Sequence, residues 1–104
     1  MELGDLGRFA DPAVLILSSL AGGDKHGYAL VKDIEEFAGV KLGPGTLYGA
    51  LSRLEQRGLV EPLEAEERRR PYRLTARGAD ALRAYLLHAR AVAQVGLVRL
   101  AGAT

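Results

Sequence analysis

Two groups of residues in this chain are suited to binding phosphate groups, through side chains or through backbone N–H groups. The first group lies between Gly43 and Gly58 and consists of Gly45, Thr46, Tyr48, Ser52, Arg53 and Gln56. The second group is a run of three arginines, Arg68, Arg69 and Arg70. Hydroxyl, amide and guanidinium groups donate hydrogen bonds to phosphate oxygens and to base edges. Together these residues favour nucleic-acid binding.

Each of these features also has a purely structural interpretation. Tyr48 could pack against the segment that carries the arginines. The arginine run could pair with its own neighbours Glu64, Glu66 and Glu67, since exposed ion pairs of this kind are common and weak. Lys25 and His26 together form either a plain polar turn or a further phosphate contact. The DNA interpretation is favoured for the arginines because the segment 43–58 accompanies them.

Catalytic chemistry has little support in the sequence. There is no cysteine, so disulfides, thiolate metal ligands and thiol nucleophiles are excluded. The two histidines, His26 and His88, are far apart in sequence and give no metal-binding pattern. We find no nucleophile with a neighbouring base, no carboxylate pair and no glycine-rich phosphate loop. We therefore expect a protein that is not an enzyme and that has no metal or other cofactor.

The segment 43–58 must form a helix to present its polar side chains together. Leu47, Ala50, Leu51 and Leu54 repeat at helical spacing and predict one narrow buried stripe. Pro44 suits the first helical turn, and Gly58 suits a left-handed stop. The opposite face is small and uncharged, with Gly45, Gly49, Ser52 and Gln56. Such a face lets another bulky surface come close.

Two further helices are expected before this one. Asp11-Pro12 is a start signal for an apolar helix that ends near Gly22-Gly23. Residues 24–26 are expected to form a turn. A helix over 27–38 is predicted to bury Leu30, Ile34, Phe37 and Ala38, and to expose Lys32, Asp33, Glu35 and Glu36.

After Gly58 the period changes from 3.6 to about 2. LVEPL and PYRLT are predicted to form a two-stranded hairpin with a charged tip, and Pro62 and Pro71 should lie at an edge or at a strand end. Thr75 then caps a final helix through about residue 101. Three helices followed by a hairpin form the winged helix-turn-helix pattern, in which the third helix enters the DNA major groove. The expected fold is mainly α with a small β-hairpin.

The final helix carries an apolar stripe that is too long for one small core to cover. We expect residues 76–104 to form a dimerisation helix on the order of 38 Å long. Coverage of the stripe within a single subunit is the alternative. The predicted dimerisation residues are Leu82, Tyr85, Leu86, Ala89, Ala93, Leu97 and Leu100.

Length and composition set the remaining bounds. The chain has 104 residues, 48% of them hydrophobic, and its net charge is +1, too small to argue for nucleic acid by itself. Acidic residues dominate 1–24 and arginines dominate 75–104. No segment resembles a signal peptide or a membrane span, so a cytoplasmic protein without membrane contact is expected. Residues 1–75 would form the DNA-binding domain, with 1–11 as an arm or short helix containing Leu3, Leu6 and Phe9.

Three segments together resemble the PadR family of bacterial transcriptional regulators. They are HGYALVKDIEE, GPGTLYGALSRLEQRGLVE and RRRPYRLTARG, in the order and at the spacing of that family, over about residues 12–80. The single helix after them is similar to the small subfamily that lacks an extended C-terminal domain. The resemblance implies an N-terminal winged helix and a dimerising C-terminal helix. It also implies a repressor that binds an operator on double-stranded DNA. Many members are released by a small-molecule effector.

The resemblance also implies roles for individual residues. Gly45, Thr46 and Tyr48 match the phosphate-contacting start of the reading helix, Arg53 falls where that helix is commonly basic, and Arg69 and Arg70 correspond to the basic wing. Gly49 and Ser52 depart from the usual pattern and leave the operator sequence open. Some members hold flat aromatic drugs between Trp side chains, and this chain has no Trp.

One function of another class stays open at this point. A winged-helix domain can serve as a protein-binding module that does not contact DNA, because fold does not fix function. The affinity of a phosphate-contacting dimer for duplex DNA should fall steeply with salt, because neutralised phosphates release counterions. A protein-binding module should bind duplex DNA weakly at any salt concentration.

Overall fold

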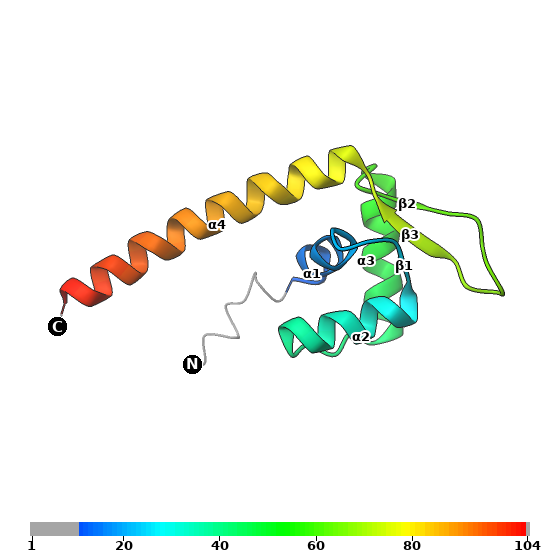
Figure 1. Cartoon of the computed structure of the whole chain (residues 1–104), viewed down its shortest axis with the longest axis horizontal. Helices are drawn as coiled ribbons and strands as arrows, with labels where there is room; N and C mark the ends of the chain where they lie inside the picture. The colour runs from blue at the N-terminus through cyan, green and yellow to red at the C-terminus, as the bar shows by residue number, and fades with distance from the viewer. Residues whose placement is uncertain (1–10, 104) are drawn as a thin grey trace.

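The computed structural model describes residues 11–103, and Figure 1 shows their arrangement. The elements are α1 (Pro12–Leu20), β1 (Lys25–His26), α2 (Gly27–Ala38), α3 (Pro44–Gln56), β2 (Val60–Pro62), β3 (Pro71–Leu74) and α4 (Ala76–Gly102). The first three helices pack together, and the β2–β3 hairpin and α4 leave this core in opposite directions (Figure 1). The predicted arm with Leu3, Leu6 and Phe9 lies outside the described residues.

Local capping explains where the helices begin and end. The Asp11 carboxylate accepts a hydrogen bond from Ala13 N at 2.9 Å, and Thr75 Oγ1 accepts one from Gly78 N at 3.0 Å. Both contacts satisfy a backbone donor that has no partner within the helix. Gly39 directly follows α2 and Gly58 follows the C-cap residue of α3, and both adopt left-handed conformations, with φ of 68° and 73°. These starts and stops confirm the boundaries predicted for the helices.

The sheet contains one strand more than predicted. Its order is β1-β3-β2, with both pairs antiparallel. Lys25 pairs with Tyr72 and His26 with Pro71, so the residues expected to form a turn are extended and lie beside the hairpin. This strand has only two residues, too few for an alternating pattern to predict it. Pro62 ends β2 and Pro71 begins β3, as predicted.

The core lies between α1, α2 and α3 and is closed by the sheet and by the first turns of α4. Leu47, Ala50, Leu51 and Leu54 are all buried, which confirms the inner stripe of α3. The prediction for the end of α2 is wrong, because Phe37 is 51% exposed and Ala38 is also exposed. The stripe is therefore fully buried at Leu30 and Ile34 but not in the last turn of α2.

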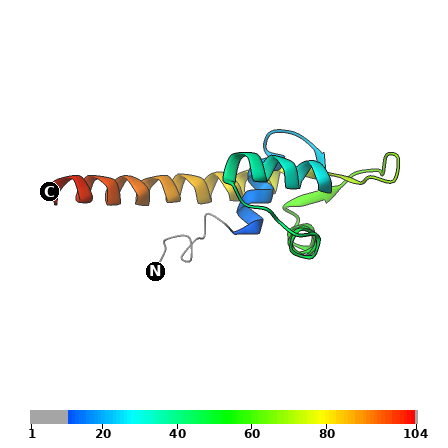
Figure 2. The same ribbon diagram turned by 90° about the horizontal axis from the view of Figure 1, so that it is seen from below.

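Helix α4 divides into a buried start and an exposed remainder. Leu82 is only 6% exposed and belongs to the core of its own subunit, which corrects its assignment as a dimerisation residue. Gly78 lies so close to the Leu59 carbonyl that a Cβ atom would overlap it. Beyond Tyr85 the helix projects alone (Figures 1 and 2), and its large apolar side chains are exposed: Leu86, Leu87, Val92, Val95, Leu97, Val98 and Leu100. The molecule measures 57 × 27 × 20 Å as a result.

Candidate nucleic-acid interface

Helix α3 presents an open outer face. Opposite its buried stripe, Gly49 is half-buried, and the exposed residues are Gly45, Thr46, Tyr48, Ser52, Arg53 and Gln56. An added Cβ atom at Gly45 would meet nothing within 4 Å. The face is therefore narrow and uncrowded over most of its length. This is the shape that a major groove of about 12 Å width admits.

The β2–β3 connection forms a tight charged tip beside α3. The backbones of Glu66 and Arg69 exchange hydrogen bonds of 2.7 and 2.8 Å. Between them, Glu67 and Arg68 have φ of 47° and 70°. Residues other than Gly, Asn and Asp adopt this left-handed backbone conformation at a cost in free energy. Positive φ at both central residues is the geometry of a type I′ hairpin turn. This turn holds the arginine run at the end of the hairpin.

The three arginines are not paired with the neighbouring acids. Within residues 11–103, Arg68, Arg69 and Arg70 form no ion pair. Arg70 Nη1 donates a hydrogen bond of 2.9 Å to the Leu63 carbonyl. The self-paired loop that the sequence allowed is therefore not formed. The positive charge of the tip is available to an anion.

A hollow of about 260 Å³ joins the tip to the two helices of the helix-turn-helix. His26, Tyr48 and the three arginines line it together with Gly27, Tyr28 and Tyr72. His26 Nε2 lies 3.4 Å from Arg69 Nη1, and His26 Nδ1 lies 3.5 Å from Ala29 N. A neutral imidazole has one acceptor nitrogen, so it can accept from only one of these two donors at a time. Arg69 is therefore held loosely.

Tyr48 packs against the start of α2 and also lines the hollow beside the hairpin tip. A Cβ atom at Gly27 would overlap the Tyr48 hydroxyl, so the glycine is what allows the ring to lie against the start of α2. The side chain is nevertheless 52% exposed. Its hydroxyl makes no hydrogen bond to any residue in the described part of the chain. The ring is packed while the hydroxyl is free to donate.

Six of the predicted contact residues do not line the hollow: Lys25, Gly45, Thr46, Ser52, Arg53 and Gln56. The Lys25 ammonium donates to the Ser19 carbonyl and lies 3.8 Å from the Asp33 carboxylate. These contacts tie β1 to α1 and α2, so Lys25 has a structural role, and its contact with a phosphate stays a prediction. Arg53 lies on the α1 side of α3, where it lines a separate hollow with Asp11 and Arg57. It is exposed but does not join the arginines of the tip.

Sequence reasoning missed Tyr28 and Tyr72, which also line the hollow. The pKa of Tyr72 is raised, first because burial disfavours its charged form and second because Glu55 is nearby. The Tyr72 hydroxyl therefore stays protonated and able to donate. Alternation along β3 could have indicated that Tyr72 and Arg70 lie on the same face. Nothing in the sequence placed Tyr28 there.

No group of three or more His, Asp or Glu side chains within residues 11–103 is arranged to hold a metal ion. None of the described helices is long and apolar enough to cross a membrane.

The three-helix core, the hairpin wing and the arginine-lined hollow define a winged helix-turn-helix protein. The profile of the transcriptional regulator PadR-like family matches residues 16–84. The chain therefore belongs to the PadR-like family of transcriptional regulators, which bind DNA. This family consists of transcription regulators and not of enzymes.

Solved structures of regulators share the fold. A PadR family transcription regulator from Clostridium difficile is 31% identical, with a TM-score of 0.74 over 81% of this chain and 92% of that one. A transcriptional regulator from Clostridium thermocellum is 31% identical, with a TM-score of 0.72 over 80% and 86%. RosR from H. salinarum is 28% identical, with a TM-score of 0.68 over 99% and 100%. The similarity to RosR extends into α4.

A curated relative is longer than this chain. A 37.1 kDa protein of transposon TN4556 from Streptomyces fradiae is 51% identical over 75 residues. The match covers 72% of this chain but only 22% of the relative. The matched part of this chain therefore spans about a fifth of that protein.

Proposed function

We propose that this protein is a homodimeric repressor that binds a specific operator on double-stranded DNA in the cytoplasm. In this proposal α3 enters the major groove, and the hairpin tip contacts the adjacent backbone or minor groove. Binding blocks access of RNA polymerase to the promoter. A small-molecule effector releases the repressor.

One observation carries this proposal. The three arginines of the tip are free of acidic partners, and they share a hollow with Tyr48 at the start of α3. Figure 1 shows α3 and the wing on the side of the core away from the end of α4. One duplex can therefore contact both elements without meeting α4. The hydroxyls of Tyr48 and Thr46 would donate to phosphates beside the α3 start.

In this proposal the apolar stripe on the outer part of α4 is the dimer interface. The residues assigned to the interface are Tyr85, Leu86, Ala89, Ala93, Leu97 and Leu100, on one side of α4 beyond the core residue Leu82. Two copies joined along this stripe would aim their α3 helices at successive major grooves, about 34 Å apart on a palindromic site. Lone α4 helices would leave the stripe in water, which disfavours the monomer.

The test is a salt titration of binding to operator DNA. Selection from random duplexes first yields the bound sequence, and a symmetric motif is expected. Fluorescence anisotropy then follows Kd against salt for the wild type, for Arg69→Ala/Arg70→Ala and for the control Arg83→Ala/Arg99→Ala. The wing variant should bind all sequences more weakly, and its salt slope should fall by about 0.9 per lost phosphate contact.

The control variant removes the same charge from α4 and should keep the wild-type salt slope. If both variants behave alike, the wing does not contact phosphate. If the wild type shows little duplex affinity at any salt concentration, the domain is instead a protein-binding module.

A further inference from the structure

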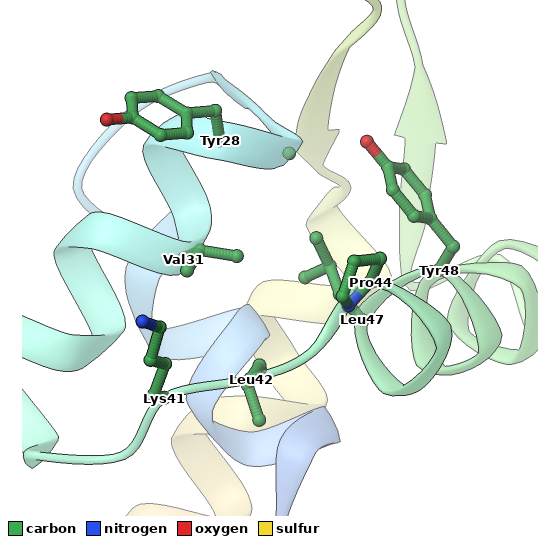
Figure 3. Close-up of a pocket in the computed structure, with 8 residues that line it drawn as sticks. Tyr28, Val31, Lys41, Leu42, Pro44, Leu47 and Tyr48 are labelled. Carbon is green, nitrogen blue, oxygen red and sulfur yellow. The ribbon is translucent and has the colours of Figure 1, made fainter.

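A second hollow, distinct from the arginine-lined one, lies between α2 and α3. Its volume is about 350 Å³, within the range of small-molecule sites. Figure 3 shows the start of α2 on one side, the start of α3 on the other, and the connection between them below. Val31, Leu42, Pro44 and Leu47 give it an apolar lining. A hydrocarbon or aromatic body would be desolvated there.

One cation lies at the edge of this apolar pocket. Lys41, in the connection between α2 and α3, lines the pocket, and its side chain extends toward α2 (Figure 3). Within residues 11–103 its ammonium makes no ion pair and no hydrogen bond. An apolar pocket with one unpartnered cation at its edge matches a ligand that has an apolar body and one negative charge.

Tyr48 forms a wall shared by this pocket and the arginine-lined hollow. Gly27, Tyr28 and Tyr48 line both spaces. The Tyr48 ring is held by packing against Gly27, and its hydroxyl has no hydrogen-bond partner among the described residues. A ligand in the pocket would press on the ring and would also project toward the face of α3. Either effect removes a group that the proposed DNA contact uses.

We infer that the pocket between α2 and α3 binds a small amphipathic carboxylate, and that this binding competes with DNA. The apolar body lies on Val31 and Leu47, and the carboxylate pairs with Lys41. Occupancy displaces Tyr48 and so weakens the contact at the start of α3. This inference rests on the proposed DNA-binding function. In this inference the effector binds between the two helices of the helix-turn-helix, α2 and α3, and away from α4.

The test uses a matched pair of probes, 2-naphthoate and the neutral naphthalene-2-methanol. Backbone amide NMR shifts are followed in the full chain without DNA. Naphthoate should shift the amides of Val31, Leu42 and Leu47 and should bind about threefold to tenfold more tightly than the alcohol. Lys41→Gln, at an exposed position, should remove that preference and leave alcohol binding unchanged. Val31→Phe should fill the pocket and weaken both probes.

The second measurement is displacement of the selected operator, followed by fluorescence anisotropy. Naphthoate should raise the apparent Kd for DNA in the wild type and should do so less in Lys41→Gln at the same concentration. His88→Ala, at an exposed position of α4 outside the assigned interface residues, is the control for binding along this helix and should behave as the wild type.

Each outcome decides one part of the inference. Equal affinity for acid and alcohol overturns the carboxylate class, and shifts confined to α4 overturn the location. Pocket binding that leaves DNA affinity unchanged overturns the competition. If the protein binds no DNA at all, the NMR measurement still decides whether the pocket takes the carboxylate, so failure of the proposed function is separable.

Discussion

The winged-helix core and the outer part of α4 are both rich in apolar residues, but these residues are buried in the core and exposed on α4. In the core, Ile16, Leu30 and Ile34 are fully buried within the subunit. On α4, Leu86 is 42% exposed and Leu100 is 69% exposed. The core residues are buried within the subunit, whereas the outer part of α4 leaves its large apolar side chains exposed. An apolar pattern alone therefore does not say which of its residues are internal and which bind another surface.

The largest expected effect tests whether the exposed apolar stripe of α4 is a dimer interface. In Leu86→Glu, two carboxylates would enter the dimer interface, and each buried unpaired charge costs about 3–5 kcal/mol. Light scattering should report monomers, and DNA affinity should fall by at least about a hundredfold. Gln94→Glu adds the same charge one helical turn after Arg90, outside the assigned stripe, and should remain dimeric. A dimeric Leu86→Glu would show that this stripe is not the interface.

A second change tests how tightly the first turn of α4 packs against the core. In Gly78→Ala, the new Cβ would overlap the Leu59 carbonyl, a backbone atom that moves only with its strand. Thermal or urea unfolding should show a loss of about 2–3 kcal/mol. Gly45→Ala, where nothing lies within 4 Å, should leave the free energy of unfolding nearly unchanged. Equal stability of both variants would contradict the packing described here.

A smaller effect is expected from the hydroxyl of Tyr48. Tyr48→Phe keeps the ring against Gly27, so the unfolding midpoint should not change. Loss of one donor to phosphate should weaken operator binding about threefold to tenfold, without altering sequence preference. Tyr85→Phe on α4 is the matched control. An unchanged Kd for Tyr48→Phe would mean that the ring serves packing alone.

The smallest effect concerns the turn at the wing tip. Glu67 has φ of 47°, and Asn tolerates that conformation better than Glu. Glu67→Asn should raise the free energy of unfolding by about 0.5–1 kcal/mol. Glu66→Asn removes the same charge at the neighbouring bridge position and should give no such gain. Equal changes in the two variants would assign the effect to charge.

Elements with strong local signals were predictable. Asp11-Pro12, Gly39, Gly58 and Thr75 set helix ends through interactions with residues a few positions away, so the sequence carried the information. The outer face of α3 followed from its period. The positions of Lys25, Phe37 and Leu82 were not predictable in this way. Each depends on which distant element covers it, and a helical stripe has the same appearance whether or not anything does.

The sequence by itself determined the order of the four helices and the β2–β3 hairpin, the face of α3 that turns outward, and membership of the PadR-like family. Only the tertiary structure decided that β1 joins the wing, that Tyr48 lies on Gly27, and that two hollows share this ring. The physical reason is distance along the chain. Caps and periods act within about a turn or two, whereas the pairing of Lys25 with Tyr72 forms only after the core has brought them together.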